Sequence, residues 1–187
     1  MPRLVAERAD AIPALAELFR EHGFDGTSLA LISERTGLGR SSLYHFFPGG
    51  KEEMAAAVLA EIDAWFEQEI FGPLRSDPDP RQAIAEMLSA VEAYFQSGRR
   101  ICLVGAFALN DARDRFAAQI QGYFVSWQAA LADALRRQGH TTEAAGDLTE
   151  AALAAIQGGL VLARAIDDPV AFQRTVARVR HGLGCDA

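Results

Sequence analysis

Two short helical patterns separated by a glycine-containing turn constrain this chain more than any other part of its sequence. The turn is Thr36-Gly37-Leu38-Gly39, and the pattern before it starts at about Leu29. Counted from Leu29, small residues occupy the fifth and ninth positions, Ser33 and Gly37. Two helices that cross at about 90 to 120° leave no room for larger side chains at these points. The segment therefore predicts a helix-turn-helix.

The second pattern of this pair runs from about Gly39 to Phe47 and ends at Pro48-Gly49-Gly50. Leu43 is expected to face inward, and the residues around it supply a cation, hydroxyl groups and a phenol. Such groups pair with base edges in the major groove of DNA or with phosphate oxygens. Residues 27–51 contain three basic residues and one acidic residue, in a chain whose net charge is -7. The acidic excess lies elsewhere in the chain, so it does not argue against a DNA partner.

The rest of the sequence is a series of helical patterns without a convincing strand. Apolar residues recur at helical spacing, and Ser76-Asp77-Pro78-Asp79-Pro80 is the clearest linker-like stretch. The expected longer helices cover about residues 4–22, 51–70, 84–98, 111–138, 142–166 and 169 onward, with a short apolar piece at 102–109. We therefore expect an all-α fold of about nine helices.

The sequence offers no motif for a membrane span, a metal site or an enzyme. It has no window of about 18 uninterrupted apolar residues, and its start lacks the pattern of a secretion signal. Cys102 and Cys185 lie far apart without the spacing of metal ligands, and the four histidines fall in separate expected elements. There is no nucleophile elbow, phosphate loop or HExxH motif. We expect a soluble, cytoplasmic protein with no cofactor, no metal and no enzymatic activity.

The segment around the turn, followed into the next helix, reads TSLALISERTGLGRSSLYHFFPGGKEEM and resembles the DNA-binding motif of the TetR family of transcriptional regulators. The junction Pro-Gly-Gly-Lys-Glu-Glu and the later Cys102-Leu103-Val104-Gly105 are similar to the branch that contains the LmrA and YxaF repressors. The resemblance implies a helix-turn-helix DNA-binding domain at residues 1–50 and a larger helical ligand-binding and dimerisation domain at residues 51–187. Family members commonly have serine and glycine at the positions of Gly39 and Ser41 here, and histidine at that of Phe46.

The resemblance and the side-chain chemistry together point to a set of DNA contacts. The set is Thr27, Ser28, Arg40, Ser41, Ser42, Tyr44, His45 and Lys51. Residues near the N-terminal end of a recognition helix point deepest into the groove, so we assign Arg40 and Ser41 to base reading. Thr27, Ser28, Tyr44, His45 and Lys51 are expected to contact phosphates. For Thr27 and Ser28, helix capping alone is an equal alternative, and Tyr44 could instead pack against the first helix.

Aromatic residues are frequent in the second part of the chain. Aromatic stripes at helical spacing form a core more often than a pocket, but the resemblance implies an inducer site between central helices, mostly apolar with a few polar groups. The candidate ligand contacts are Phe66, Tyr94, Phe107, Tyr123, Phe124, Trp127 and Gln128.

The last two expected helices carry small and apolar residues that suit either a core or an interface. The candidate dimer contacts are Leu148, Ala151, Ala155, Gly159, Leu162, Phe172 and Val176. One short recognition helix reads only a few base pairs, whereas two held about 34 Å apart read a palindrome. We therefore expect a C2 homodimer formed through a four-helix face.

The expected function is a ligand-responsive DNA-binding transcriptional regulator, a repressor as is usual in this family. Its expected partners are a palindromic operator in double-stranded DNA, a second copy of the chain and a small apolar or aromatic inducer, and no membrane. Inducer binding would move the helix that begins at Lys51 and so change the spacing of the two recognition helices. The alternative is a helical small-molecule-binding module that has lost DNA recognition.

Overall fold

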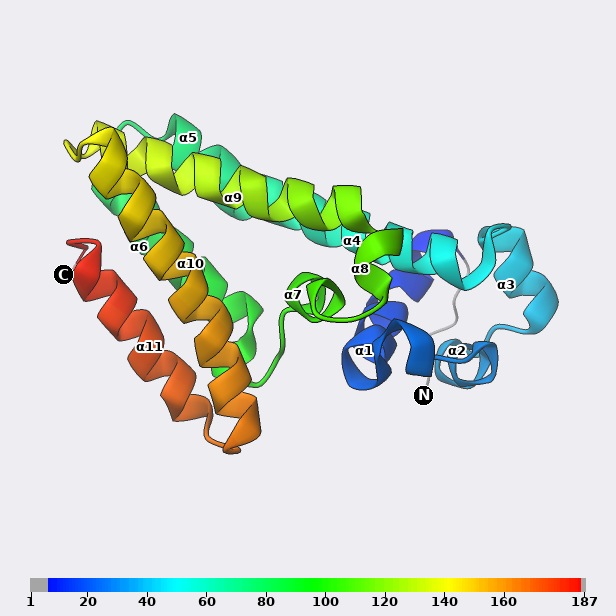
Figure 1. Cartoon of the computed structure of the whole chain (residues 1–187). Helices are drawn as coiled ribbons and strands as arrows, with labels where there is room; N and C mark the ends of the chain where they lie inside the picture. Colours follow the sequence, from blue (N-terminus) through cyan, green and yellow to red (C-terminus); the bar gives the residue numbers. More distant parts are fainter. Residues whose placement is uncertain (1–6, 186–187) are drawn as a thin grey trace. The chain divides into compact units, whose positions relative to one another are not determined.

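The computed structural model describes residues 7–185, and these residues form helices without any strand (Figure 1). The elements are α1 (Arg8–Gly26), α2 (Leu29–Thr36), α3 (Arg40–Phe46), α4 (Gly50–Phe66), η1 (Glu67–Phe71), α5 (Gly72–Ser76), α6 (Pro80–Tyr94), η2 (Gln96–Gly98), α7 (Leu103–Ala108), α8 (Ala112–Arg115), α9 (Ala117–Arg137), α10 (Thr142–Ala165) and α11 (Pro169–Gly182). The all-α expectation is therefore confirmed. The expected start of the first helix near residue 4 lies outside the described residues.

The helices are more numerous than expected because two long patterns are interrupted. The pattern from Lys51 continues through a π-helical turn, η1, into the separate short helix α5. The pattern from Asp111 is divided at Phe116, where φ is -115° and ψ is 23°, so α8 and α9 are separate. Apolar periodicity continues across both interruptions, which is why the sequence pattern does not reveal them.

Capping side chains set where several helices begin. The Ser28 hydroxyl accepts a hydrogen bond of 3.2 Å from a backbone N–H in the first turn of α2, and Gly37 ends that helix with φ of 72°. Side chains of Asp79, Thr141 and Asp168 cap α6, α10 and α11 in the same manner. These oxygens bind N–H groups that lack a partner within the helix, so each cap stabilises a helix start.

The chain folds into two compact units that are not contiguous in sequence. The first unit contains the described residues up to Ala64 together with Leu103–Gln121. The second contains Trp65–Cys102 and the described residues from Gly122 onward. Helices α4 and α9 each contribute residues to both units. The first unit thus combines the helix-turn-helix with a segment that lies much further along the chain.

Four phenylalanine rings hold α7 and α8 against α1 in the first unit. The Phe107 ring centroid lies 6.1 Å from that of Phe19 and 6.2 Å from that of Phe24. The Phe116 centroid lies 5.3 Å from Phe24 and 5.6 Å from Phe107. All four side chains are buried. Aromatic pairs contribute about 0.5–1.5 kcal/mol beyond their burial, so this phenylalanine cluster makes α7 and α8 part of the helix-turn-helix unit.

A second, mixed aromatic cluster fills part of the second unit, with Phe66 at its centre. The Phe66 ring centroid lies between 4.9 and 6.4 Å from those of Phe71, Tyr94, Phe95, Tyr123 and Trp127. The Trp127 indole N–H donates to the sulfur of Met87 at 3.4 Å. Trp65, Tyr94 and Phe124 lie at the edge of this mixed cluster and are half-buried.

Helix α10 is the one described helix that is long and apolar enough to cross a membrane by length and composition alone. Its residues Leu153, Ile156 and Leu160 are buried inside the protein, and its N-terminal half carries the exposed acidic residues Asp147 and Glu150. A helix with a buried apolar side and exposed charges fits the core of a helical unit.

Candidate nucleic-acid interface

Helix α3 presents a polar face to solvent. Leu43 and Phe47 are buried and hold the helix against its own unit. Arg40, Ser41 and His45 are exposed, as is Tyr44, whose exposed fraction is 42%. Ser42 is half-buried. Because inward and outward residues alternate as expected for a helix of this length, most of the predicted DNA contacts on α3 share one accessible surface.

The charge of Arg40 is available, unlike that of three other arginines in the first unit. Arg8 pairs with Glu53 at 3.1 Å, Arg20 with Glu17 at 2.7 Å and Arg35 with Glu21 at 2.9 Å. Arg40 makes no ion pair with any of the described residues. A guanidinium without a carboxylate partner keeps all five donors for bases or phosphates.

The ion pair between Glu21 and Arg35 joins α1 to α2. The hydrogen bond from Arg35 lowers the pKa of Glu21 below its ordinary value, and the same contact raises the pKa of Arg35. Both side chains are exposed, so the pair adds little to stability at moderate salt. It occupies the guanidinium of Arg35, which leaves Arg40 as the arginine of this motif that is open to a ligand.

The Thr27 side chain is not available to DNA. It is fully buried, and its hydroxyl donates to the carbonyl oxygens of Gly23 at 2.6 Å and Leu18 at 3.3 Å. The hydroxyl thus fastens the end of α1 to the start of α2, which corrects its expected phosphate contact. Ser28 is exposed while it caps α2, so capping does not remove it from the surface.

A polar hollow of about 560 Å³ opens beside α3, where α1 ends and α2 and α4 begin. Ser28, Tyr44 and Lys51 line it together with Asp25 and Glu52. The N-terminal ends of α2 and α4 both carry N–H groups without intrahelical partners, which favour an anion. The hollow brings together three of the predicted phosphate contacts.

Lys51 faces this hollow with its ammonium group already held in place. Its Nζ donates to the carbonyl oxygen of Phe24 at 2.8 Å and lies 4.4 Å from the centre of the Phe24 ring. An ammonium has three donors, so this contact orients the charge without exhausting it. Arg115 also lines the hollow, although it comes from α8. No sequence signal identifies Arg115, because nothing in α8 predicts that it packs beside α1.

The two departures from the family pattern have definite structural roles. Gly39 stands at the N-cap of α3 and, lacking a side chain, makes no side-chain cap. A Cβ added to Gly39 would meet open space, so the backbone here is accessible. The Phe46 carbonyl oxygen accepts a hydrogen bond of 3.1 Å from Arg8 Nε, and its ring lies 5.5 Å from that of His45. Phe46 therefore supports the end of α3.

The predicted ligand contacts do not form one group. Phe66, Tyr123 and Trp127 are buried inside the mixed aromatic cluster. Tyr94 and Phe124 are half-buried at its edge, and Gln128 is exposed. Phe107 instead belongs to the phenylalanine cluster of the first unit, which corrects its placement among the ligand contacts.

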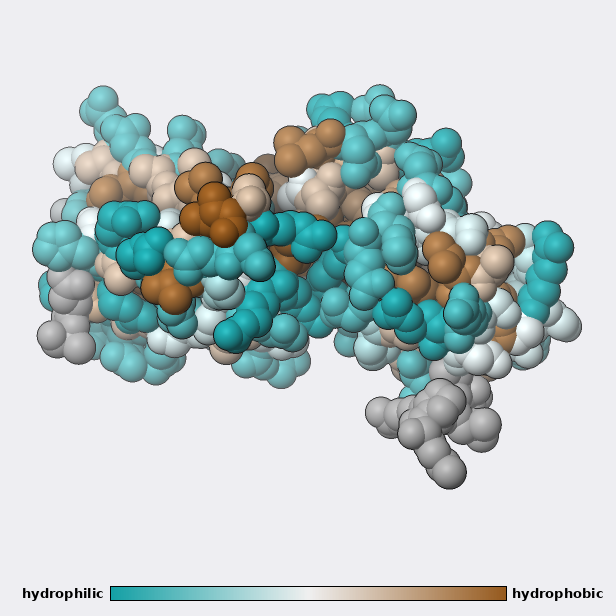
Figure 2. Space-filling view, turned by 90° about the horizontal axis from the view of Figure 1, so that it is seen from below, coloured by the Kyte–Doolittle hydropathy of each residue, from teal (hydrophilic) through white to brown (hydrophobic). Residues whose placement is uncertain are grey.

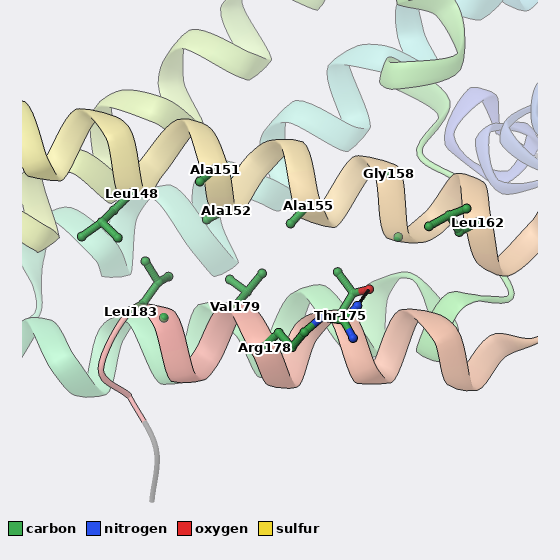
Figure 3. Close-up of a pocket in the computed structure, with 12 residues that line it drawn as sticks. Leu148, Ala151, Ala152, Ala155, Gly158, Leu162, Thr175, Arg178, Val179 and Leu183 are labelled. Carbon is green, nitrogen blue, oxygen red and sulfur yellow. Dashed lines mark hydrogen bonds between the residues drawn. The ribbon is translucent and has the colours of Figure 1, made fainter.

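The predicted dimer contacts divide between a groove and a core. Leu148, Ala151, Ala155, Gly159 and Leu162 line a groove of about 410 Å³ between α10 and α11, where side chains of the two helices point toward one another (Figure 3). Phe172 and Val176 are buried and do not line it, because they lie on the side of α11 that packs into the second unit. The residues of α11 that line the groove, and that the sequence did not single out, are Thr175, Arg178, Val179 and Gly182, followed by Leu183.

Comparison with known proteins identifies the chain's relatives. A family model described as bacterial regulatory proteins of the tetR family matches residues 12–58, and one described as the C-terminal domain of LmrA/YxaF-like transcriptional regulators matches residues 80–178. The HTH-type transcriptional regulator LmrA of Bacillus subtilis (strain 168) is 27% identical over 160 residues, which cover 83% of this chain and 85% of that protein.

Solved structures of transcriptional regulators share the fold. A TetR transcriptional regulator from Legionella pneumophila superposes with a TM-score of 0.80 at 19% identity, covering 92% of this chain and 94% of that one. A cysteine mutant of the TetR family regulator CifR, complexed with 26-bp double-strand operator DNA, superposes with a TM-score of 0.73 at 24% identity over 100% of both chains. The chain belongs to the TetR family of bacterial transcriptional regulators, which are DNA-binding proteins and not enzymes, and its C-terminal part is LmrA/YxaF-like.

Proposed function

We propose that this regulator is a cytoplasmic repressor that binds a palindromic operator as a homodimer and leaves it when a small apolar or aromatic molecule binds. The observation that carries the proposal is the exposed polar face of α3, on which Arg40 has no ion-pair partner among the described residues. Arg40 and Ser41 stand in the first turn of α3 and would read base edges. Ser28, Tyr44, His45 and Lys51 would contact phosphates.

A second copy of the chain is the occupant that we propose for the α10/α11 groove. The groove is lined mainly by alanine, glycine and branched apolar residues. Beside it, Leu162 and Ile166 are 57% and 59% exposed. The face of the molecule seen in Figure 2 is largely hydrophilic, with separate apolar patches. Exposed apolar surface next to a groove marks an interaction site, and two-fold symmetry would place identical grooves face to face.

The mixed aromatic cluster supports an inducer site within residues 51–187. Tyr94 and Phe124 at its edge are half-buried, and the exposed Gln128 follows on α9. Half-buried aromatic rings with a few polar groups suit a small apolar or aromatic ligand. The ligand would release DNA only to the extent that it binds the conformer that does not fit the operator more tightly. We accordingly divide the functions between residues 1–50 for DNA and 51–187 for ligand and partner.

Mobility shift of the DNA upstream of the regulator's own gene tests the proposal. We expect a discrete complex with a palindromic site and a dimer in sedimentation at micromolar concentration. Absence of any specific complex, with binding of small aromatic molecules retained, would instead support a binding module that has lost DNA recognition. Gly39, which leaves α3 without a side-chain cap, favours that alternative.

Exchanging Arg40 for alanine separates base reading from general affinity. Arg40→Ala should reduce the preference for the operator over altered sites by about 1–3 kcal/mol, because a bidentate arginine contact to guanine is lost. Titration of the operator and of single-base variants measures this preference. Lys51→Ala is the matched control and should weaken binding to all sequences and flatten the salt dependence. Unchanged preference in Arg40→Ala would contradict the assignment.

A further inference from the structure

We propose that Arg115, in α8, is an additional contact to the DNA backbone. This inference rests on the proposed operator binding and extends it to a residue outside residues 1–50. It gives the short segment α7–α8 a direct part in holding DNA.

The position of Arg115 is fixed by the buried residues on either side of its helix. Ala112 and Phe116 are both buried, and the Phe116 ring packs 5.3 Å from that of Phe24. The Arg115 guanidinium consequently lies 5.7 Å from the centre of the Phe24 ring. Lys51 approaches the same ring to 4.4 Å. Two cations from distant parts of the chain are therefore gathered around one ring at the end of α1.

Arg115 opens into the polar hollow that holds the proposed phosphate contacts. It lines the hollow together with Ser28, Tyr44 and Lys51. Its side chain is 54% exposed, and its distance to the nearest Glu52 oxygen is 3.9 Å. The ion pairs of Arg8, Arg20 and Arg35 are much shorter, at 2.7 to 3.1 Å. The long contact leaves the planar guanidinium able to take a phosphate in bidentate fashion.

Two carboxylates also face this hollow and shape what it can bind. Asp25 and Glu52 line it opposite the charges of Lys51 and Arg115. Their charges formally cancel, so net charge alone does not attract a phosphate. A phosphate at the side of the two cations would also meet the N-terminal ends of α2 and α4, whose dipoles favour an anion. Removal of the Glu52 charge should then strengthen binding, because that carboxylate competes for Arg115.

Operator titrations of the full-length regulator at several salt concentrations test this role. Arg115→Gln should bind the operator and unrelated DNA more weakly by a similar factor. The slope of log affinity against log salt should flatten by about 0.9, the value for one lost phosphate contact. Glu52→Gln should raise affinity for both DNAs. Arg113→Gln is the matched control, since Arg113 lies on the same helix, pairs with Asp114 at 2.8 Å and does not line the hollow; it should leave affinity and slope unchanged.

The outcomes separate this inference from the proposed function. If the unmodified regulator binds its operator while Arg115→Gln keeps the same affinity and salt slope, the inference fails and operator binding stands. If the unmodified regulator binds no DNA, the proposed function itself fails. Should Arg115→Gln unfold more easily, Arg115→Lys, which retains the charge, must restore most of the affinity and the slope. Failure of that restoration, or a change in base preference in place of a uniform loss, overturns the inference.

Discussion

The two aromatic clusters of this regulator are built from different side chains. The phenylalanine cluster of the first unit consists of Phe19, Phe24, Phe107 and Phe116, none of which has a polar atom in its side chain. The mixed aromatic cluster of the second unit adds tyrosine and tryptophan, and Trp127 already donates to Met87. A cluster of phenylalanine alone can only pack, whereas tyrosine and tryptophan can pack and also bind polar atoms. The comparison distinguishes a structural cluster from a candidate ligand site.

The largest expected effect is the loss of a ring from the phenylalanine cluster. Phe116→Ala should lower the free energy of unfolding by about 3–5 kcal/mol, because the ring is buried and its neighbours cannot fill the space. DNA binding should fall with it, since Phe116 packs against the end of α1. Urea unfolding and operator titration measure both. Stability within 1 kcal/mol of the unmodified protein, about the error of such a comparison, would show that α8 is not held by this ring.

A hydroxyl introduced into the phenylalanine cluster breaks the comparison directly. Phe107→Tyr places a polar group at a fully buried position among apolar rings. It should cost about 1–3 kcal/mol of unfolding free energy, because the new hydroxyl leaves water without a partner. Phe124→Tyr, at the half-buried edge of the mixed aromatic cluster, is the control and should be nearly neutral. Equal costs at the two positions would remove the distinction between the clusters.

A truncation at the edge of the mixed aromatic cluster tests its proposed ligand role. Phe124→Ala should lower the free energy of unfolding by roughly 1 kcal/mol, less than a fully buried ring, while abolishing release of DNA by the inducer. Operator binding without inducer should be retained. The measurement is complex dissociation as inducer is added, with thermal unfolding as the check on folding. Normal release in a folded Phe124→Ala variant would place the ligand elsewhere.

The smallest expected effect is the pH dependence of one ion pair in each unit. The pKa values of Glu21 and Asp133 are both lowered, chiefly by hydrogen bonds from Arg35 and Arg136. A lowered pKa means that the pair stabilises the folded state above the ordinary carboxylate pKa of about 4 and loses this contribution as the pH falls through the lowered value. Glu21→Gln and Asp133→Asn should therefore be slightly destabilising at pH 7.

Chemical unfolding at pH 7 and at pH 3, followed by fluorescence and helicity, measures the difference of each variant from the unmodified protein. This difference should shrink at the lower pH. If the units unfold separately, the Glu21 variant should shift one transition and the Asp133 variant the other. A difference that grows at low pH would contradict the direction of the pKa shifts.

The sequence predicts which faces of the helices are buried better than it predicts what they pack against. Ser33 and Gly37 identify the turn because local geometry demands small residues, and in the structure the Ser33 hydroxyl donates to the Leu38 carbonyl oxygen at 2.5 Å. Thr27 was open to two interpretations because a hydroxyl near a helix start suits either a cap or a phosphate. Its burial depends on how α1 ends, at a glycine with φ of 69°.

Long-range partners are not encoded in a helical period. The apolar spacing around Phe107 and Phe172 shows that each side chain is buried, but not which element covers it. Phe107 proved to face α1, and Phe172 the core of the second unit rather than a groove. Arg115 carries no periodic signal at all. Its place in the hollow follows from the packing of Phe116, which only the three-dimensional structure reveals.

The inclusion of α7 and α8 in the first unit bears on how members of this family could exchange parts. A chimaera that joins residues 1–64 of this chain to the remainder of another regulator would bring Phe19 and Phe24 against foreign residues in place of Phe107 and Phe116. Such a graft would keep the recognition helix and lose half of the rings beneath it. DNA specificity in this protein is therefore heritable as a unit only when a short internal segment is transferred with it.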